Sequence, residues 1–301
     1  NKDLEKTDGK KKTRINVPKL CDANLAGTKK SKDCTLILTE GDSAKTMAIA
    51  GLSVVGRDTY GVFPLKGKIL NVREASINDI SNNKEITSIK KILGLQSNVE
   101  YTFESLQKEW PLRYGRILIM TDQDHDGSHI KGLVINLFDH LWPQLLDNKF
   151  MCSMLTPIIK ASKGKISKSF YTIQDYEKWK KIRNNHKWKI KYYKGLGTST
   201  TKEAKEYFKE LKIVYYTREN TEVVSNINNA EFLIQKKKNL ESCRIDLAFN
   251  KKRANDRKEW LYKYDRNIIL DSAQEDVTFN EFIDKELIHF SNASNDRSIP
   301  D

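Results

Sequence analysis

The chain has 301 residues, of which 38% are hydrophobic, so it can bury a core and is too apolar for wholesale disorder. No apolar run approaches the ~18 residues that a membrane-spanning helix needs, which excludes a transmembrane protein of that type. Lys and Arg number 53 against 40 Asp and Glu, a net charge of +13. This excess predicts either a polyanionic partner or simply a basic surface.

The first third of the chain predicts one strand–turn–helix unit. Residues 1–34 are polar and basic without hydrophobic periodicity, which is typical of a linker or arm. A β-prone run at Thr35–Thr39 then ends in the acidic turn Glu40–Ser43, and apolar residues at helical spacing follow it. A second strand is predicted at Tyr60–Phe63, and a polar helical stretch at residues 76–93.

The same unit recurs further along the chain. Arg116–Met120 is an apolar run of the buried-strand type, and it ends in the acidic turn Thr121–Gly127. Apolar residues from Ile130 to Leu145 then recur at steps of three and four, which predicts an amphipathic helix. Alternating strands and helices indicate a parallel sheet with helices on its faces, and ligand sites in such sheets lie at the carboxyl ends of the strands.

Residues 161–216 are predicted to form a basic, β-rich extension. Between residues 160 and 194 there are 12 Lys or Arg and two acids, with aromatic residues interleaved. This pattern fits either an antiparallel hairpin region with a solvated basic face or a nucleic-acid surface. A glycine loop at Lys194–Thr198 then leads into the capping box Thr200-x-x-Glu203, which starts a helix. A glycine loop that leads into a helix N-terminus is a ready anion site.

The C-terminal part predicts an insertion followed by helices. Residues 217–240 are rich in Asn, Glu and Lys with few apolar anchors, so a mobile insertion is predicted there. Residues 241–301 are predicted to be helical. One helix is expected around Asp256–Tyr264, and another begins at the capping box Thr278-x-x-Glu281.

The segment Asp122-x-Asp124-x-Asp126-Gly127 is the sharpest local signal for chemistry. At 4 Å and an effective dielectric constant near 20, each pair of ionised carboxylates repels by roughly 4 kcal/mol. Such a cluster at the end of a buried strand needs a cation, and its hard oxygen ligands suit Mg²⁺.

Several interpretations of the acidic turn remain open. A calcium EF-hand is disfavoured, because a strand precedes the loop and its twelfth position is Leu133 instead of Glu. An Asp-x-Asp site of a nucleotide-sugar transferase or phosphotransferase is a second possibility. In a third, adjacent parallel strands bring Glu40 beside Asp122 and Asp124, forming a three-carboxylate site for one or two metals that act on a phosphodiester. In a fourth interpretation, the acidic turn is simply a charged loop that the dipole of the following helix stabilises, and it binds no ligand.

Five short motifs in a fixed order carry a family resemblance. They are Glu40–Ala44 (EGDSA), Pro64–Lys68 (PLKGK), Asn71–Glu74 (NVRE), Thr121–Ile130 (TDQDHDGSHI) and Lys194–Thr198 (KGLGT). Together they resemble the TOPRIM domain of type IIA topoisomerases, which belongs to the breakage-reunion region of those enzymes. The resemblance is to eukaryotic DNA topoisomerase II and not to bacterial gyrase. The resemblance runs from about Ile15 to the end and thins only across residues 217–240.

The resemblance implies a fold and a set of site residues. The fold would be α/β: a TOPRIM (Rossmann-like) parallel sheet flanked by helices at residues 35–160, with the basic extension and the C-terminal helices appended. Metal ligands and catalytic residues would be Glu40, Asp122 and Asp124, and Asp126 would support the metal. The residues implied to contact DNA are Gly41, Asp42, Lys66, Lys68 and Lys194. The implied ion is Mg²⁺, for which Mn²⁺ or Ca²⁺ can substitute in binding.

The resemblance also implies a function for a longer protein. It would be a nuclear, homodimeric, ATP-driven enzyme that passes one double-stranded DNA through a transient break in another, without a membrane partner. Its ATPase region would precede Asn1, and the chain itself has no G-x-x-x-x-G-K-[ST] loop, so ATP is not expected to bind here. Its nucleophilic tyrosine would lie in a winged-helix domain after Pro300, so none of the 12 tyrosines is expected to serve. The rival hypotheses are another TOPRIM enzyme, such as a primase or nuclease, and a non-catalytic nucleic-acid-binding module.

Overall fold

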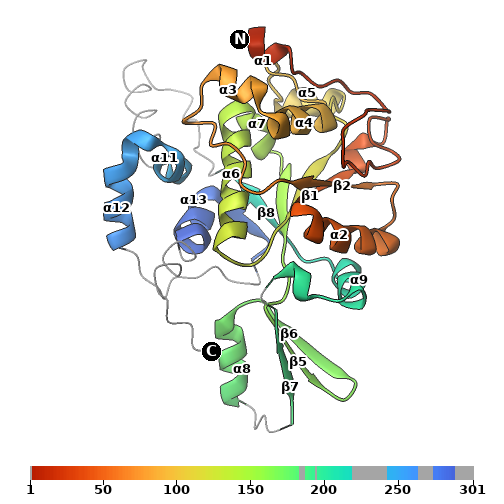
Figure 1. Cartoon of the computed structure of the whole chain (residues 1–301), viewed down its shortest axis with the longest axis vertical. Coiled ribbons are helices and arrows are strands. Elements are labelled where there is room, and N and C mark those ends of the chain that lie inside the picture. Colours follow the sequence, from red (N-terminus) through yellow and green to blue (C-terminus); the bar gives the residue numbers. More distant parts are fainter. Residues whose placement is uncertain (1, 183–186, 194, 219–242, 264–273, 289–301) are drawn as a thin grey trace.

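A six-stranded sheet forms the centre of the molecule in the computed structural model, which describes residues 2–182, 187–193, 195–218, 243–263 and 274–288. The strand order is β2-β1-β3-β4-β8-β9 (Figure 1). The strands are β1 Thr35–Glu40, β2 Tyr60–Leu65, β3 Arg116–Met120, β4 Met151–Met154, β8 Ile213–Thr217 and β9 Asp276–Thr278. The first four are mutually parallel, β8 is antiparallel to β4, and β9 is parallel to β8. The predicted α/β class, with a mainly parallel sheet, is confirmed.

Side chains of alternate residues along the strands enter two different cores. Leu36 and Ile117 face one hydrophobic core, whereas their neighbours Ile37 and Leu118 face the other. Helices α4 (Lys84–Leu93) and α6 (His125–Leu141) cover the first face, and α2 (Gly41–Val55) and α9 (Thr201–Lys209) cover the second (Figure 1). Both faces of the parallel strands are therefore buried, which is why these strands are continuous apolar runs in the sequence.

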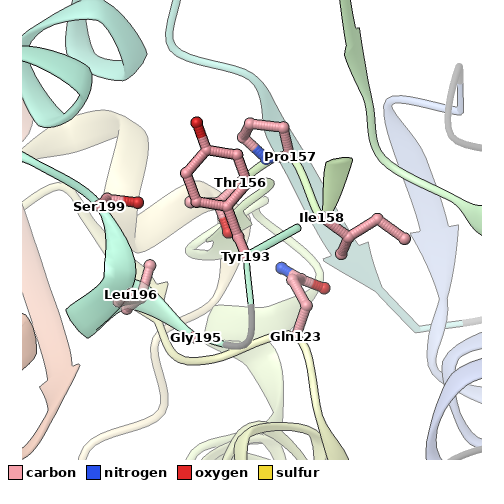
Figure 2. Close-up of a pocket in the computed structure, with 8 residues that line it drawn as sticks. All are labelled: Gln123, Thr156, Pro157, Ile158, Tyr193, Gly195, Leu196 and Ser199. Carbon is pink, nitrogen blue, oxygen red and sulfur yellow. The ribbon is translucent and has the colours of Figure 1, made fainter. Parts of the chain in front are cut away.

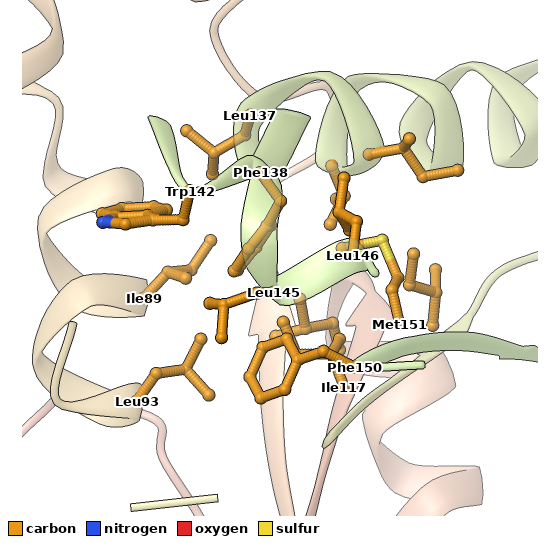
Figure 3. Close-up of a cluster of buried hydrophobic side chains, with 14 of the residues drawn as sticks. Ile89, Leu93, Ile117, Leu137, Phe138, Trp142, Leu145, Leu146, Phe150 and Met151 are labelled. Atoms are coloured by element: carbon orange, nitrogen blue, oxygen red, sulfur yellow. The ribbon is translucent and has the colours of Figure 1, made fainter. Parts of the chain in front are cut away.

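The larger core lies where α4 and α6 meet the sheet. Figure 3 shows Phe138 and Trp142 at the end of α6 pointing toward Ile89 and Leu93 of α4. Helix α6 ends at Leu141, and α7 (Pro143–Leu146) begins with a proline, whose missing N–H cannot continue a helix. The predicted helix up to Leu145 is thus two helices.

The helical stretch predicted at residues 76–93 is also divided in two. Helix α3 (Ile77–Asn82) ends just before Asn83. The Asn83 side chain then accepts hydrogen bonds from the N–H groups of Glu85 and Ile86 at the start of α4. An asparagine in this role is a strong N-cap, so it begins a new helix instead of continuing the old one. A further short helix, α5 (Phe103–Lys108), precedes β3.

The segment predicted as a basic arm is part of the fold: α1 (Lys2–Glu5) packs against α3, the Gly9 N–H donates to the Leu95 carbonyl after α4, and Cys21 pairs with Val62 of β2. It also contains the short 3-10 helix η1 (Ser31–Asp33). Asp22 forms an ion pair at 2.5 Å with the fully buried Arg113, and the buried Lys90 forms one with Asp8 at 2.8 Å. These ion pairs help to hold the polar stretch against the rest of the fold. They could not be predicted from the spacing of hydrophobic residues in the sequence.

The basic extension contains a second sheet with order β6-β5-β7, all antiparallel. Its strands are β5 Ile159–Lys163, β6 Ile166–Phe170 and β7 Lys189–Tyr192, and helix α8 (Ile173–Ile182) packs on it. Phe170, Tyr176 and Trp179 form its own small core. Three of the seven aromatic residues interleaved with the lysines are therefore core, whereas Tyr192 is 60% exposed, and most of the lysines face the solvent.

The C-terminal segments form a group of short helices, two of which pack against α6. They comprise α11 (Arg244–Phe249), the 3-10 helix η3 (Lys251–Arg253), α12 (Ala254–Tyr262), the one-turn α13 (Phe279–Glu281) and the π-helical turn η4 (Phe282–Leu287). The capping box predicted at Thr278 and Glu281 is present. The predicted insertion lies, from residue 219, outside the described residues. No helix in the described parts of the chain is long and apolar enough to cross a membrane.

Candidate metal centre

The two acidic turns meet at the carboxyl edge of the parallel sheet. Strands β1 and β3 are direct neighbours, with Thr39 opposite Met120. Glu40 is the last residue of β1 and the N-cap residue of α2, and Asp122 follows β3 by two positions. The Asp122 N–H donates a hydrogen bond to Glu40 Oε2 at 3.4 Å. The neighbouring strands thus bring these two acids together although 82 residues separate them in sequence.

The Asp122–Asp124 turn is held largely by backbone N–H donors. Asp122 Oδ1 accepts the Leu196 N–H at 2.6 Å, from the glycine loop that precedes α9. Asp124 is the N-cap of α6, and its Oδ1 accepts the Gly127 N–H at 2.8 Å. A Cβ at Gly127 would lie 2.0 Å from the Asp122 carbonyl oxygen, so the turn requires glycine there.

Burial and mutual repulsion destabilise the ionised forms of two of the acids. The pKa of Glu40 is raised by burial and by repulsion from Asp122, Asp124 and Asp126, and the hydrogen bond from the Asp122 N–H opposes the shift. The pKa of Asp122 is raised by burial and by Asp124, against the Leu196 N–H. Holding both carboxylates ionised therefore costs free energy that a bound cation would restore.

Lysines neutralise the acids at the margin of this cluster. Lys68 forms an ion pair with Asp126 at 2.7 Å, and their hydrogen bond lowers the pKa of Asp126. Lys19 pairs with Asp42 at 2.6 Å, and the pKa of Asp42 is likewise lowered. By contrast, Glu40 has no ion-pair partner within the described ranges, and the same holds for Asp122 and Asp124.

The PLKGK loop (Pro64–Lys68) lies beside the acidic cluster, and a hydrogen bond from its main chain holds it in place. The Lys66 N–H donates to Glu85 Oε1 at 2.6 Å, and burial raises the pKa of this glutamate. The Lys66 side chain itself is exposed, and Gly67 adopts a φ of 99°, which disfavours any other residue. Gly41 likewise opens α2 with a φ of 73°. The remaining DNA candidate, Lys194, lies outside the described residues.

The donor set suits a hard divalent cation. Glu40, Asp122 and Asp124 offer carboxylate oxygens, the hard ligands that Mg²⁺ prefers. Their oxygens do not surround a single point: within the described ranges, no three His, Cys, Asp or Glu side chains are arranged so that they could hold a metal. The Asp122 carboxylate turns to the Leu196 N–H, and the Asp126 carboxylate turns to Lys68.

A small cavity lies between Gln123 of the acidic turn and Gly195 and Leu196 of the glycine loop. Its volume is about 10 Å³, roughly the space of one water molecule. Figure 2 shows Gln123 and Tyr193 among the side chains that line it. Gln123 Nε2 is buried and has no hydrogen-bond partner within the described part of the chain. The glycine loop thus closes over the acidic turn with almost no free space.

Two family models match the chain, one after the other. The Toprim domain matches residues 35–154, and the C-terminal associated domain of TOPRIM matches residues 154–295. The chain belongs to the TOPRIM family. Its Toprim domain covers the strands and both acidic turns described above, and the associated domain covers the basic sheet, the glycine loop and the C-terminal helices.

Its relatives are eukaryotic type II topoisomerases. The chain is 53% identical to DNA topoisomerase 2-beta of Gallus gallus, over 94% of this chain and 17% of that protein. It is 50% identical to DNA topoisomerase 2-alpha of Mus musculus, over 98% of this chain and 19% of that protein. The chain therefore spans less than a fifth of the length of these curated relatives.

A solved structure shares the fold. It is the DNA-binding, cleavage and re-ligation domain of Plasmodium falciparum topoisomerase II, which is 47% identical and superposes with a TM-score of 0.81. The match covers 96% of this chain and 37% of that one. The predicted resemblance to the TOPRIM region of eukaryotic DNA topoisomerase II is confirmed.

Sequence reasoning missed the contacts that fix the site. Glu85 was predicted only as part of a helical stretch, and the glycine loop was predicted as an anion site, whereas its Leu196 N–H meets a carboxylate of this same chain. Both contacts join segments far apart in sequence, so no local pattern indicates them.

Proposed function

We propose that this chain is the metal-binding part of the DNA cleavage and religation centre of a type II DNA topoisomerase, with Mg²⁺ as the resident ion. The observation that carries the proposal is the pair Glu40 and Asp122. These half-buried acids come from neighbouring parallel strands, have raised pKa values and lack an ion-pair partner within the described residues.

Each residue has a role in this proposal. Glu40, Asp122 and Asp124 would hold the metal, which when bound supplies positive charge to the phosphate at which the strand breaks. We also propose that Glu40 accepts or releases a proton during cleavage and religation; burial raises its pKa above the ordinary value. Lys66 and Lys68 stand exposed beside the acids and attract the DNA backbone.

The nucleophile belongs to another part of the whole protein in this proposal. Tyr193 lies at the glycine loop, but its hydroxyl donates to Glu203 at 2.5 Å, and burial and this hydrogen bond raise its pKa. It is thus engaged and kept protonated, which makes it a poor nucleophile. ATP hydrolysis, assembly as a homodimer and a nuclear location are proposed for the whole protein on its relationship to the topoisomerases.

The test is covalent adduct formation on double-stranded DNA by the whole protein that contains this chain. End-labelled DNA is incubated with Mg²⁺, the protein is denatured, and protein-linked DNA is counted. Glu40→Gln and Asp122→Asn should each reduce the adduct by orders of magnitude while the far-UV circular dichroism stays unchanged. Glu259→Gln, an exposed acid on α12, is the matched control and should behave as the wild type.

The same assay separates the rival functions. A metal-independent affinity for DNA with no adduct would favour a non-catalytic binding module. Mg²⁺-dependent cleavage that leaves no protein on the DNA would favour a nuclease. Full adduct formation by Asp122→Asn would refute the assignment of the acids.

A further inference from the structure

The glycine loop contacts the Asp122 carboxylate directly. The Leu196 N–H donates to Asp122 Oδ1 at 2.6 Å, a short, charge-assisted hydrogen bond across 74 residues of sequence. Asp122 lies at the tip of the acidic turn after β3, and Leu196 lies in the short 3-10 helix η2 (Leu196–Thr198) before α9. The loop therefore contacts a proposed metal ligand through its main chain.

Gly195 is required by space and not by its backbone angles. Its φ of 168° is extended backbone that any residue adopts. A Cβ at this position would lie 2.4 Å from Asp122 Oδ2 and 2.9 Å from Asp122 Cγ. Since real Cβ contacts are essentially never this short, any side chain here pushes the carboxylate away. The second glycine, Gly197, differs, because a Cβ there would meet no described atom within 4 Å.

Leu196 is anchored by its own side chain and by the segments that flank it. The Leu196 side chain is 4% exposed and belongs to the core between the sheet and helices α2 and α9, with Ala204 and Phe208. On the far side of the loop, Glu203 accepts hydrogen bonds from Tyr193 at 2.5 Å and from the Thr200 N–H at 2.8 Å. One carboxylate thus ties the strand before the loop to the helix after it.

We infer that Gly195 and Leu196 are positioning residues for the metal: they orient the Asp122 carboxylate through the main chain, and only glycine at position 195 permits the approach. The inference rests on the proposed function, in which Asp122 is a ligand. Outer partners that orient metal ligands contribute about 10- to 100-fold to metal affinity. The glycine loop therefore serves the metal directly, in addition to any contact with DNA.

The experiment measures Mn²⁺ binding to the full 301-residue chain by the electron paramagnetic resonance signal of the free ion. Gly195→Ala is expected to weaken Mn²⁺ binding by about 10- to 100-fold. Gly197→Ala is the matched control and should bind within about twofold of the wild type. Circular dichroism and thermal unfolding without metal check that each variant folds, because a general loss of structure would lower the melting temperature of the metal-free chain as well.

A spectroscopic readout follows the hydrogen bond itself. The Leu196 amide proton should resonate downfield in the metal-free wild type and in Gly197→Ala, and it should move upfield in Gly195→Ala and Asp122→Asn. If Gly195→Ala does not fold, an amide-to-ester replacement at Leu196 removes the donor without adding an atom, and it should weaken Mn²⁺ binding in the same direction.

The outcomes separate the two levels of the proposal. If the wild type binds Mn²⁺, Asp122→Asn does not, and Gly195→Ala and the ester bind as the wild type, the positioning role is overturned and the metal site stands. If Asp122→Asn binds Mn²⁺ as tightly as the wild type, the proposed metal site itself fails. Equal weakening by Gly195→Ala and Gly197→Ala would also overturn the inference, because it would reflect loop stiffness alone.

Discussion

Replacing Arg73 with alanine is expected to lower the free energy of unfolding by about 3 kcal/mol. The Arg73 side chain, 15% exposed, forms ion pairs with Asp139 and Asp246, which are 13% and 10% exposed, and its Nε donates to Asn136 at 2.6 Å. Removing one partner of a buried ion pair typically costs about 3–5 kcal/mol, because the other charge stays buried.

The lower end of this range applies because both carboxylates keep a second cation. Arg218 lies 4.0 Å from Asp139, and Arg253 lies 3.5 Å from Asp246. For a chain of this length, a loss of about 3 kcal/mol lowers the melting temperature by roughly 6 °C. Arg73 joins α6 to α11, so we expect the C-terminal helices to detach first.

Urea unfolding followed by circular dichroism measures the effect, and calorimetry gives the melting temperature. Arg73→Met keeps most of the volume without the charge, so a similar loss in both variants would assign the effect to charge. Lys263→Ala is the control, because its ion pair with Glu259 is mostly exposed and should contribute less than about 1 kcal/mol. A loss below about 1 kcal/mol in Arg73→Ala, or one equal to that of the control, would refute the reasoning.

Three further changes test other parts of the fold. Burial alone would raise the pKa of Glu203, but hydrogen bonds, led by that from Lys191, lower it to about 2. The ionised carboxylate therefore stabilises the fold fully above the ordinary pKa of 4.5, and this stabilisation is lost as the pH falls toward 2. Urea unfolding should show Glu203→Gln less stable than the wild type at pH 7, by an amount that shrinks at pH 3. Mutating the exposed hairpin lysines Lys163, Lys165 and Lys168 to alanine should weaken the dependence of duplex DNA affinity on salt. The slope of log affinity against log salt concentration, measured by fluorescence anisotropy, should fall in magnitude by up to about 3. Phe208→Ala should cost about 3–5 kcal/mol in urea unfolding, because its buried ring packs against Gly51 and joins α9 to α2.

Local patterns predicted the elements whose stabilising contacts are themselves local. The apolar runs at Thr35–Thr39 and Arg116–Met120 are β1 and β3, and the capping boxes at Thr200 and Thr278 begin helices in the structure. A capping box is made by residues three apart, so a reader of the sequence sees both partners at once. The parallel order of the strands followed from the alternation of strands and helices.

The contacts that sequence reasoning missed join distant segments. Residues 2–34 lack periodicity because irregularly spaced apolar residues such as Leu4 and Val17, and ion pairs such as Arg113 with Asp22, 91 residues apart, hold them in place. The aromatic residues of the basic extension were compatible with a nucleic-acid surface, but Phe170 and Trp179 fill the core of a small three-stranded sheet. A lysine-rich strand gives no local sign of which of its faces is buried, since the covering helix α8 comes later in the chain.

The candidate site depends on backbone donors for a physical reason. Glu40 accepts the Asp122 N–H, and Asp122 accepts the Leu196 N–H, so both acids are oriented by groups that carry no net charge. An N–H group fixes a carboxylate without neutralising it, whereas a lysine would satisfy the same oxygens and compete with a cation. The difference is visible at Asp126, whose carboxylate already belongs to Lys68. In the proposed site, Glu40 and Asp122 are therefore held in place without a competing cation, whereas Asp126, already paired with Lys68, would have a supporting role.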